Sequence, residues 1–299
     1  MTEALLNILE SKLGKGKIRA DEPMSEHTSF KIGGPADYFF IANEIEEIKK
    51  AVRIAREAGL DYYILGSGSN LLVSDKGIRG MVIQVSSFKI QVSSFKMLID
   101  AGVPLAEVVQ QAADDGLAGL EFAVGIPGSF GGAVAGNAGA WQQAVGDRIT
   151  RVHVLSPEGG DRWLDRDECG FDYRQSRFKK SGEIVLEAEL ELKAREVGEI
   201  REMMKNYLEK RSVKPKEPSA GSIFVNPKLQ AAGTLIDQCG LKGYRIGDAQ
   251  ISPLHANFII NTGLAKCRDV LELIELCRDK VREKFGIELE QEIKFIGER

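Results

Sequence analysis

Apolar residues recur every three or four positions in six stretches of the chain, which predicts an amphipathic helix in each. Shorter runs that alternate apolar and polar residues, or are apolar throughout, predict strands between them. The predicted helices span residues 5–13, 44–58, 104–115, 196–210, 231–239 and 268–285, and the predicted strands span 38–42, 62–65, 71–73, 149–155, 183–193 and 289–296. Helices and strands interleave, so the pattern predicts a mixed α and β protein.

The pattern breaks where glycine is dense. Six of the fifteen residues in 125–139 are glycine, and the others are mostly apolar or small, unlike a polar flexible linker. We interpret this stretch as a tight turn whose main-chain N–H groups approach a large flat or anionic ligand, with a close-packed structural turn as the alternative. The Gly-Ser-Gly-Ser-Asn turn at 66–70 can form an anion-binding nest, but a strand follows it, so it is not a Rossmann loop.

Net charge and composition argue against some classes of function. The 299 residues carry a formal net charge of −4 and offer no cationic excess for phosphate backbones, so we expect no nucleic-acid binding. No run of 18 apolar residues occurs, and the N-terminus lacks the basic flank and apolar core of a signal peptide. We therefore expect a cytoplasmic protein without membrane insertion. The sequence leaves the oligomeric state open, and a monomer is compatible with it.

Cysteine and histidine give no sign of a metal site. The four cysteines, Cys169, Cys239, Cys267 and Cys277, form no Cys-x-x-Cys pair, and the three histidines are scattered. We expect reduced core thiols, and we expect His255 to be a packed, hydrogen-bonded residue rather than a base.

One heptapeptide occurs twice. Residues 83–89 are repeated letter for letter at 90–96, and both copies alternate apolar and polar residues. Each copy therefore predicts a half-buried strand, and we assign no chemistry to either.

Six motifs, taken in order, resemble the family of UDP-N-acetylenolpyruvoylglucosamine reductases (MurB). They lie at 27–37, 66–70, 125–140, 173–179, 221–227 and 292–297. Each motif alone is a weak signal, but six in register over nearly the whole chain are specific. The short connection between Arg174 and Glu183 resembles the subclass that lacks an inserted tyrosine loop.

The resemblance implies an α+β fold of the vanillyl-alcohol-oxidase type. Its FAD-binding domain would span residues 1–205 in two α/β subdomains, roughly 1–75 and 76–205. A smaller α+β substrate-binding domain would span 206–299, with its last strand returning to the active site. The resemblance implies non-covalent FAD held by Gly66, Ser67, Gly68, Ser69, Asn70, Gly125, Ile126, Pro127, Gly128, Gly131, Gly132, Asn137 and Gly139.

The implied reaction is a hydride relay, in which NADPH reduces FAD and the reduced flavin reduces the enolpyruvyl group of UDP-N-acetylenolpyruvoylglucosamine to give UDP-N-acetylmuramate for peptidoglycan synthesis. Hydride addition leaves an enolate-like charge that needs a cation and a proton. By resemblance, Arg174 stabilises that charge, Ser222 donates the proton and Glu292 assists. Glu290, two residues earlier on the same strand face, is the obvious misassignment for Glu292.

The residues of the trio carry plainer interpretations without the resemblance: a loop arginine, a turn serine and an exposed strand acid. The substrate-binding residues that the resemblance suggests are Lys214, Asn226 and Tyr244, with Lys216 as a further candidate. Two other functions stay open at this point. One is an FAD oxidase or dehydrogenase of the same fold that acts on a sugar or hydroxy acid, and the other is a non-catalytic nucleotide-binding module.

Overall fold

The computed structural model describes residues 3–86, 89–211 and 214–298. The chain forms two compact units. Unit 1 comprises Met1–Ile18, Phe40–Ser67 and Val82–Ser212, and unit 2 comprises Arg19–Phe39, Gly68–Met81 and Val213–Arg299. These units group the chain differently from the predicted domains 1–205 and 206–299, because two early segments join the C-terminal one. The functional limits of the domains stay a prediction.

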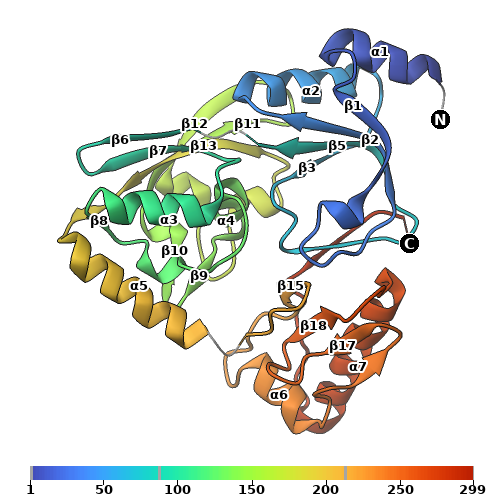
Figure 1. Cartoon of the computed structure of the whole chain (residues 1–299), viewed down its shortest axis with the longest axis vertical. Coiled ribbons are helices and arrows are strands. Elements are labelled where there is room, and N and C mark those ends of the chain that lie inside the picture. Colours follow the sequence, from blue (N-terminus) through green and yellow to red (C-terminus); the bar gives the residue numbers. More distant parts are fainter. Residues whose placement is uncertain (1–2, 87–88, 212–213, 299) are drawn as a thin grey trace. The chain divides into compact units, whose positions relative to one another are not determined.

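Unit 1 is built on a five-stranded sheet with the order β12-β11-β13-β7-β6, in which every neighbouring pair is antiparallel. Its strands are β6 (Ile90–Ser93), β7 (Lys96–Asp100), β11 (Ile149–Leu155), β12 (Asp161–Asp165) and β13 (Ile184–Glu191). Helices α3 (Leu105–Asp114) and α4 (Phe130–Gly136) lie on one face of this sheet, where α4 contacts β7 and β13 (Figure 1). Helix α5 (Val197–Arg211) packs against α3. The helix that begins in the glycine-rich stretch, α4, is therefore held against the sheet of unit 1.

A second sheet, of order β1-β2-β5-β3, contains residues of both units, because the boundary between the units falls within β2 and β5. Its strands are β1 (Ile18–Pro23), β2 (Pro35–Ala42), β3 (Tyr62–Leu65) and β5 (Ile78–Val85). Helices α1 (Glu3–Leu13) and α2 (Ile45–Glu57) contact each other within unit 1. Short strands complete this unit: β8 (Leu117–Ala118), β9 (Gly139–Ala140), β10 (Gln143–Ala144) and β14 (Lys193–Ala194).

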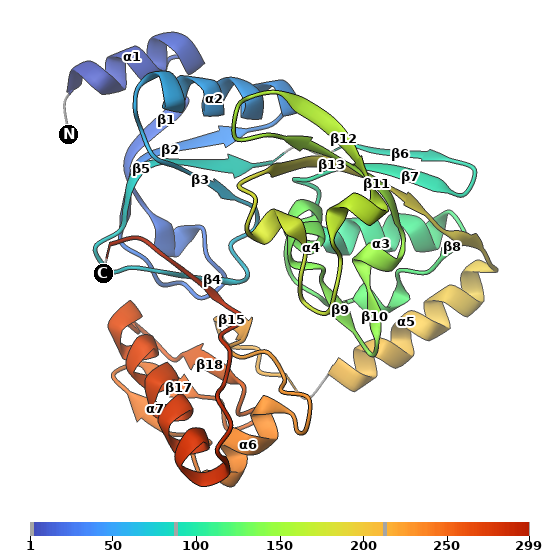
Figure 2. The same ribbon diagram turned by 180° about the vertical axis from the view of Figure 1, so that it is seen from behind.

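Unit 2 has its own sheet and core. The sheet order is β15-β18-β17-β16, with β15 (Ser219–Ser222), β16 (Arg245–Ile246), β17 (Ala249–Ile251) and β18 (Phe258–Asn261). Helices α6 (Ala232–Gln238) and α7 (Cys267–Phe285) pack together, and both are visible from behind in Figure 2. The core of unit 2 also contains Phe30, Ile32 and Leu72. Burial of these side chains explains why the two early segments belong to this unit.

Within unit 2, the last strand of the chain pairs with an early segment. Strand β19 (Lys294–Ile296) pairs in parallel with β4 (Leu71–Val73). The prediction of one strand over 289–296 is therefore only partly right. Residues before Lys294 bond irregularly instead, with a bridge between Gln291 and Phe224.

The six predicted helices are confirmed to within two residues at each end.

The two copies of the heptapeptide differ in structure and burial, which corrects the expectation of two half-buried strands. The first copy supplies buried Ile83 and Val85 to β5, whereas the second forms the exposed edge strand β6. Residues 87–88 lie outside the described residues. Strand β12 was not predicted, because its charged, mostly exposed residues carry little apolar alternation.

Asp75 caps the longest helix of unit 2 from a distant part of the chain. Its carboxylate accepts hydrogen bonds from the main-chain N–H groups of Cys267 (2.8 Å) and Arg268 (3.2 Å), at the start of α7. First-turn N–H groups have no partner within a helix, and an anion there also favours the helix dipole. The residue that precedes α7, Lys266, makes no side-chain cap of that kind.

We expect Asp75→Ala to lower the free energy of unfolding by about 1 kcal/mol, because two N–H groups of α7 lose their acceptor. Equilibrium urea unfolding measures the change. Asp279→Ala is the matched control, since Asp279 is exposed on the same helix and bonds only Arg282 among the ion pairs of the described residues. Equal unfolding midpoints for the two variants would contradict the capping role.

Candidate functional site

Helix α4 begins inside the glycine-rich stretch and is anchored to the protein from its first residue. Phe130 N donates to Val103 O (2.7 Å) and Gly131 N donates to Ala101 O (2.8 Å). Ser129 Oγ caps the helix by accepting from Gly132 N at 3.3 Å. The N–H groups of the first turn are therefore used by the protein itself, which differs from the predicted contact of this turn with a ligand.

Close packing explains several of the glycines. A Cβ on Gly131 would lie 2.6 Å from Ala101 Cβ, and one on Gly139 or Gly66 would collide with Gln143 O or Ser129 Oγ. The alternative of a close-packed turn thus accounts for Gly131 and Gly139, and close packing also accounts for Gly66. Contact of these three glycines with FAD stays a prediction. Gly125 and Gly132, by contrast, are exposed. They offer a surface without side chains, which suits the approach of a flat ring system.

The turn at 66–70 lies where the two units divide. Gly66 and Ser67 belong to unit 1, and Gly68, Ser69 and Asn70 belong to unit 2. Gly68 has a positive φ of 63°, and a Cβ there would collide with His27 O. Glycine is therefore required at this position by the fold as well as by the predicted nest.

Arg174 sits at the tip of a tight turn in unit 1. Asp172 and Gln175 exchange both main-chain hydrogen bonds, at 3.1 and 3.0 Å, so Tyr173 and Arg174 are the two central residues. Arg174 has a φ of 54°, a region that L side chains rarely adopt. Lys179 Nζ donates to Arg174 O at 2.5 Å. This backbone conformation places an arginine where glycine or asparagine is usual.

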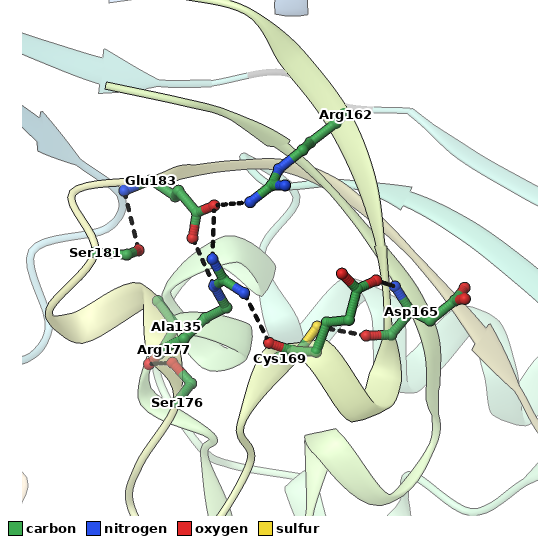
Figure 3. Close-up of polar contacts among 9 residues, drawn as sticks. Ala135, Arg162, Asp165, Cys169, Ser176, Arg177, Ser181 and Glu183 are labelled. Atoms are coloured by element: carbon green, nitrogen blue, oxygen red, sulfur yellow. Dashed lines mark hydrogen bonds and ion pairs between the residues drawn. The ribbon is translucent and has the colours of Figure 1, made fainter. Parts of the chain in front are cut away.

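Ion pairs to the buried carboxylate of Glu183 hold the segment that follows this turn (Figure 3). Arg177 donates to both carboxylate oxygens of Glu183, at 2.8 and 3.2 Å, and to Glu168 O at 3.0 Å. Arg162 donates to the same carboxylate at 3.1 Å. Only 5% of the Glu183 side chain is exposed. Arg177 is thus a structural arginine, although it lies three residues from Arg174 in the sequence.

The Glu183 carboxyl is held in its charged form. Burial alone would raise its pKa, but hydrogen bonds from Ser181, Arg162 and Arg177 outweigh burial and lower the pKa below its ordinary value of 4.5. Cys169, drawn in the same view, shows the opposite effect, because burial raises its thiol pKa to about 11. That thiol is therefore neutral and inert at ordinary pH.

Unit 1 contains a cationic and aromatic cluster that the sequence pattern does not predict. The Arg211 guanidinium lies 4.6 Å from the centre of the Trp141 ring, and that ring lies 4.7 Å from Tyr207. Arg211 donates to Phe122 O at 2.9 Å, while its buried Nε has no hydrogen-bond partner among the residues that the structure describes. Burial, and after it the nearby charge of Arg174, lowers the pKa of Arg211. The positive charges of the two arginines therefore repel each other, and an anion beside them would be favoured.

Only the lone aromatic residue after the glycine stretch could have signalled this cluster in the sequence. Trp141 follows Gly139-Ala140 directly, and it is 40% exposed, which is unusual for tryptophan. Arg211 gave no such signal, because it ends a helix in which several other charged residues occur.

The structure brings Ser222 and Glu292 together in unit 2, although 70 residues separate them in the sequence. Glu292 N donates to the carbonyl of Ile223, the residue after Ser222, at 2.7 Å, and Glu292 O accepts from Asn70 Nδ2 at 3.3 Å. The buried amide of Asn257 bonds both main-chain groups of Phe224. Two members of the predicted trio therefore share one fixed region, and Arg174 belongs to unit 1.

The predicted substrate-binding residues lie in unit 2 in different settings. Asn226 Oδ1 accepts from Ala232 N at 3.0 Å and so caps α6, while Tyr244 is 48% exposed. Lys214 Nζ lies 5.8 Å from the centre of the Phe258 ring. His255 is packed edge-on against Phe258 and accepts from Asn257 N, and burial followed by the charge of Lys214 lowers its pKa. The prediction of a packed, hydrogen-bonded His255 is confirmed.

Two kinds of feature are absent from the described residues. No helix among them is long and apolar enough to cross a membrane. No group of three or more His, Cys, Asp or Glu side chains in those same residues could hold a metal ion.

Two family models match most of the chain between them. The model of the FAD binding domain matches residues 36–164, and the model of the C-terminal domain of UDP-N-acetylenolpyruvoylglucosamine reductase matches residues 214–296. A UDP-N-acetylenolpyruvoylglucosamine reductase of Halalkalibacterium halodurans is 43% identical over 288 residues, which cover 95% of this chain and 96% of the relative.

Solved structures agree with these matches. The crystal structure of UDP-N-acetylenolpyruvylglucosamine reductase from Thermus caldophilus has a TM-score of 0.81 at 39% identity, covering 94% of this chain and all of that one. Alkyldihydroxyacetonephosphate synthase has a TM-score of 0.51 at 16% identity, covering 65% of this chain and 41% of that one, which shows a shared fold alone. The predicted vanillyl-alcohol-oxidase-type fold is confirmed.

We expect Glu183→Gln to lower the free energy of unfolding by about 2 kcal/mol at pH 7, because charged hydrogen bonds to two arginines are lost. A lowered carboxyl pKa stabilises the fold above the ordinary value of 4.5 and ceases to do so as the pH falls. The gap between wild type and variant should therefore close below that pH, in urea unfolding at several pH values.

Glu57→Gln is the control for this prediction, because its ion pair with Lys12 is exposed and should contribute little. A gap for Glu183→Gln that stays constant from pH 7 to pH 3 would contradict the role of the charge.

Proposed function

The chain belongs to the family of UDP-N-acetylenolpyruvoylglucosamine reductases, and from this membership we propose that it uses NADPH to reduce the enolpyruvyl group of that substrate to UDP-N-acetylmuramate. The observation that carries the proposal is a 43% identity to a named reductase over nearly the full length of both chains. FAD supplies the hydride when bound, which it takes from NADPH. One proton and one hydride are added across the double bond. A cytoplasmic location is part of the proposal.

Exposed glycines of the 125–132 stretch would hold the flavin, and the turn at 66–70 would hold its diphosphate. The support within unit 1 is the surface without side chains at Gly125 and Gly132 beside the buried N-terminus of α4. Asn137 has a different role in this structure, because its side-chain amide donates to Asp172 O and accepts from Gly146 N. We therefore place Asn137 behind the cofactor site rather than against the flavin.

Arg174 would stabilise the enolate-like charge that develops when hydride arrives, since a guanidinium stays charged and matches a carboxylate in shape. Arg211 lies close enough for the charge of Arg174 to lower its pKa, so an anionic ligand beside the pair would relieve their repulsion. We assign the substrate's anionic groups to this pair.

Ser222 would donate the proton to the carbon next to the one that receives hydride. A hydroxyl is a weak acid, so this role requires a strongly basic carbanion held close to it. Glu292 supports the proposal because its main chain is bonded to the residue beside Ser222. Lys214, Tyr244 and Asn226 would contact the UDP part of the substrate.

NADPH consumption tests the proposed reaction directly. We expect the purified flavoprotein to oxidise NADPH at least about tenfold faster with UDP-N-acetylenolpyruvoylglucosamine than without it, because only this substrate turns the reduced flavin over. Absorbance at the NADPH band gives the rate, and NADH in its place tests the choice of nucleotide. Rapid oxidation in air without the substrate would indicate an oxidase instead.

We expect Ser222→Ala to leave flavin reduction by NADPH unchanged and to slow reoxidation by the substrate on the order of a hundredfold, because one group that acts only in the second transition state is lost. Stopped-flow absorbance measures the two half-reactions separately. Ser252→Ala serves as a control in the same unit, since Ser252 Oγ accepts from Leu254 N in a neighbouring loop. Unchanged reoxidation in Ser222→Ala would remove this residue from the mechanism.

A further inference from the structure

We propose that Ser176 is a positioning residue, which fixes the turn that carries Arg174 against the C-terminal end of α4. This inference rests on the proposed function, because it presumes that Arg174 acts on the substrate. Ser176 lies two residues after Arg174, and its side chain points toward α4, as the close-up in Figure 3 shows for Ser176 and Ala135. It therefore acts through the backbone of the turn.

The backbone of the turn is strained at Arg174. Arg174 takes a φ of 54°, and the two hydrogen bonds between Asp172 and Gln175 close the turn around it. A residue with a side chain keeps such a backbone only where its surroundings determine it from several directions. The attachments of the turn therefore decide where the guanidinium lies.

Two side-chain hydrogen bonds attach the turn, one before it and one after it. Asn137 Nδ2 donates to Asp172 O at 2.8 Å, and Ser176 Oγ donates to Ala135 O at 2.6 Å. Ala135 lies in the last turn of α4, where carbonyls lack a partner within the helix, and Asn137 is its left-handed C-cap. Ser176 and Asn137 are 6% and 5% exposed. Both ends of the Arg174 turn are thus bonded to the helix that the glycine-rich stretch forms.

Of the two attachments, the one made by Ser176 can be removed with less disturbance to the rest of the structure. Asn137 also accepts from Gly146 N at 3.0 Å, so its removal would disturb a second loop. Arg177 binds Glu183 and Glu168 O, which holds the far side of the segment, so Ser176 and Asn137 are the side chains that bond the turn to α4. A shift of about 1 Å in a group that must meet the reacting atoms can cost a hundredfold in rate. Loss of one attachment should therefore lower the rate without removing the arginine.

The test uses the holoenzyme in five forms: wild type, Ser176→Ala, Arg174→Ala, the double variant and Thr150→Val. Thr150 is the matched control, because its hydroxyl also donates within unit 1, to the main-chain and carboxylate oxygens of Glu189 on a neighbouring strand rather than to the turn. Stopped-flow absorbance gives both half-reactions. Hydrogen exchange by mass spectrometry reports on segment 171–178 independently of activity.

We expect Ser176→Ala to bind FAD and to be reduced by NADPH within about twofold of wild type, while reoxidation by the substrate slows about tenfold or more. Exchange in segment 171–178 should rise in Ser176→Ala and stay unchanged in Thr150→Val. In the Arg174→Ala background, Ser176→Ala should slow reoxidation by less than about twofold further, because the residue it positions is gone.

The outcomes separate this inference from the proposed function. If Arg174→Ala leaves reoxidation unchanged, Arg174 has no catalytic role and the proposed function loses that assignment. If Arg174→Ala slows reoxidation but Ser176→Ala does not, or slows it equally in both backgrounds, only the positioning role of Ser176 is overturned. Asn137→Asp provides a second variant, since it keeps the acceptor for Gly146 N and loses the donor to Asp172 O. It should reproduce the slow reoxidation, and normal reoxidation there would count against the inference.

Discussion

The close contact between α4 and the loop before α3 is the constraint on which the candidate site depends. Gly131 lies against Ala101 with no room for a Cβ, and the N–H groups of Phe130 and Gly131 bond to carbonyls of that loop. The helix is short, so its position is set by these contacts rather than by its own stability. The position of α4 in turn determines that of the turn that carries Arg174, because this turn is hydrogen-bonded to the C-terminal end of the helix.

Arginines of unit 1 differ in whether a carboxylate of the protein neutralises their charge. Arg177 and Arg162 share the buried Glu183 carboxylate and are satisfied within the protein. Arg211 makes no ion pair among the described residues, and its guanidinium lies over Trp141 beside the charge of Arg174. A buried cation without a carboxylate is costly unless a ligand supplies the anion. Glu183 thus serves the structure, and the binding of an anion beside Arg211 stays a proposal.

In unit 2 the geometry comes from the backbone instead. Main-chain hydrogen bonds between residues 223–225 and 290–292 hold Glu292 beside the segment that follows Ser222, and the Asn257 side chain bonds Phe224 in that segment. The amide of Asn70 bonds Glu292 O, whereas Glu290 O accepts from Val225 N. Both acids are thus tied by their main chain, and the choice of Glu292 over Glu290 stays a prediction from the resemblance.

The sequence by itself determined the helices, the glycine-rich turns and the family, because these depend on local periodicity and on motifs that are contiguous in the chain. It also suggested Arg174, Ser222 and Glu292, but only through resemblance, since each looks ordinary in its own segment. Tertiary structure alone decided which glycines are there for packing, which arginine is neutralised, and that Trp141 and Arg211 meet. It also placed segments 19–39 and 68–81 in unit 2. The reason is physical: whether a residue is buried, crowded or paired depends on partners distant in the chain, and periodicity carries no information about them.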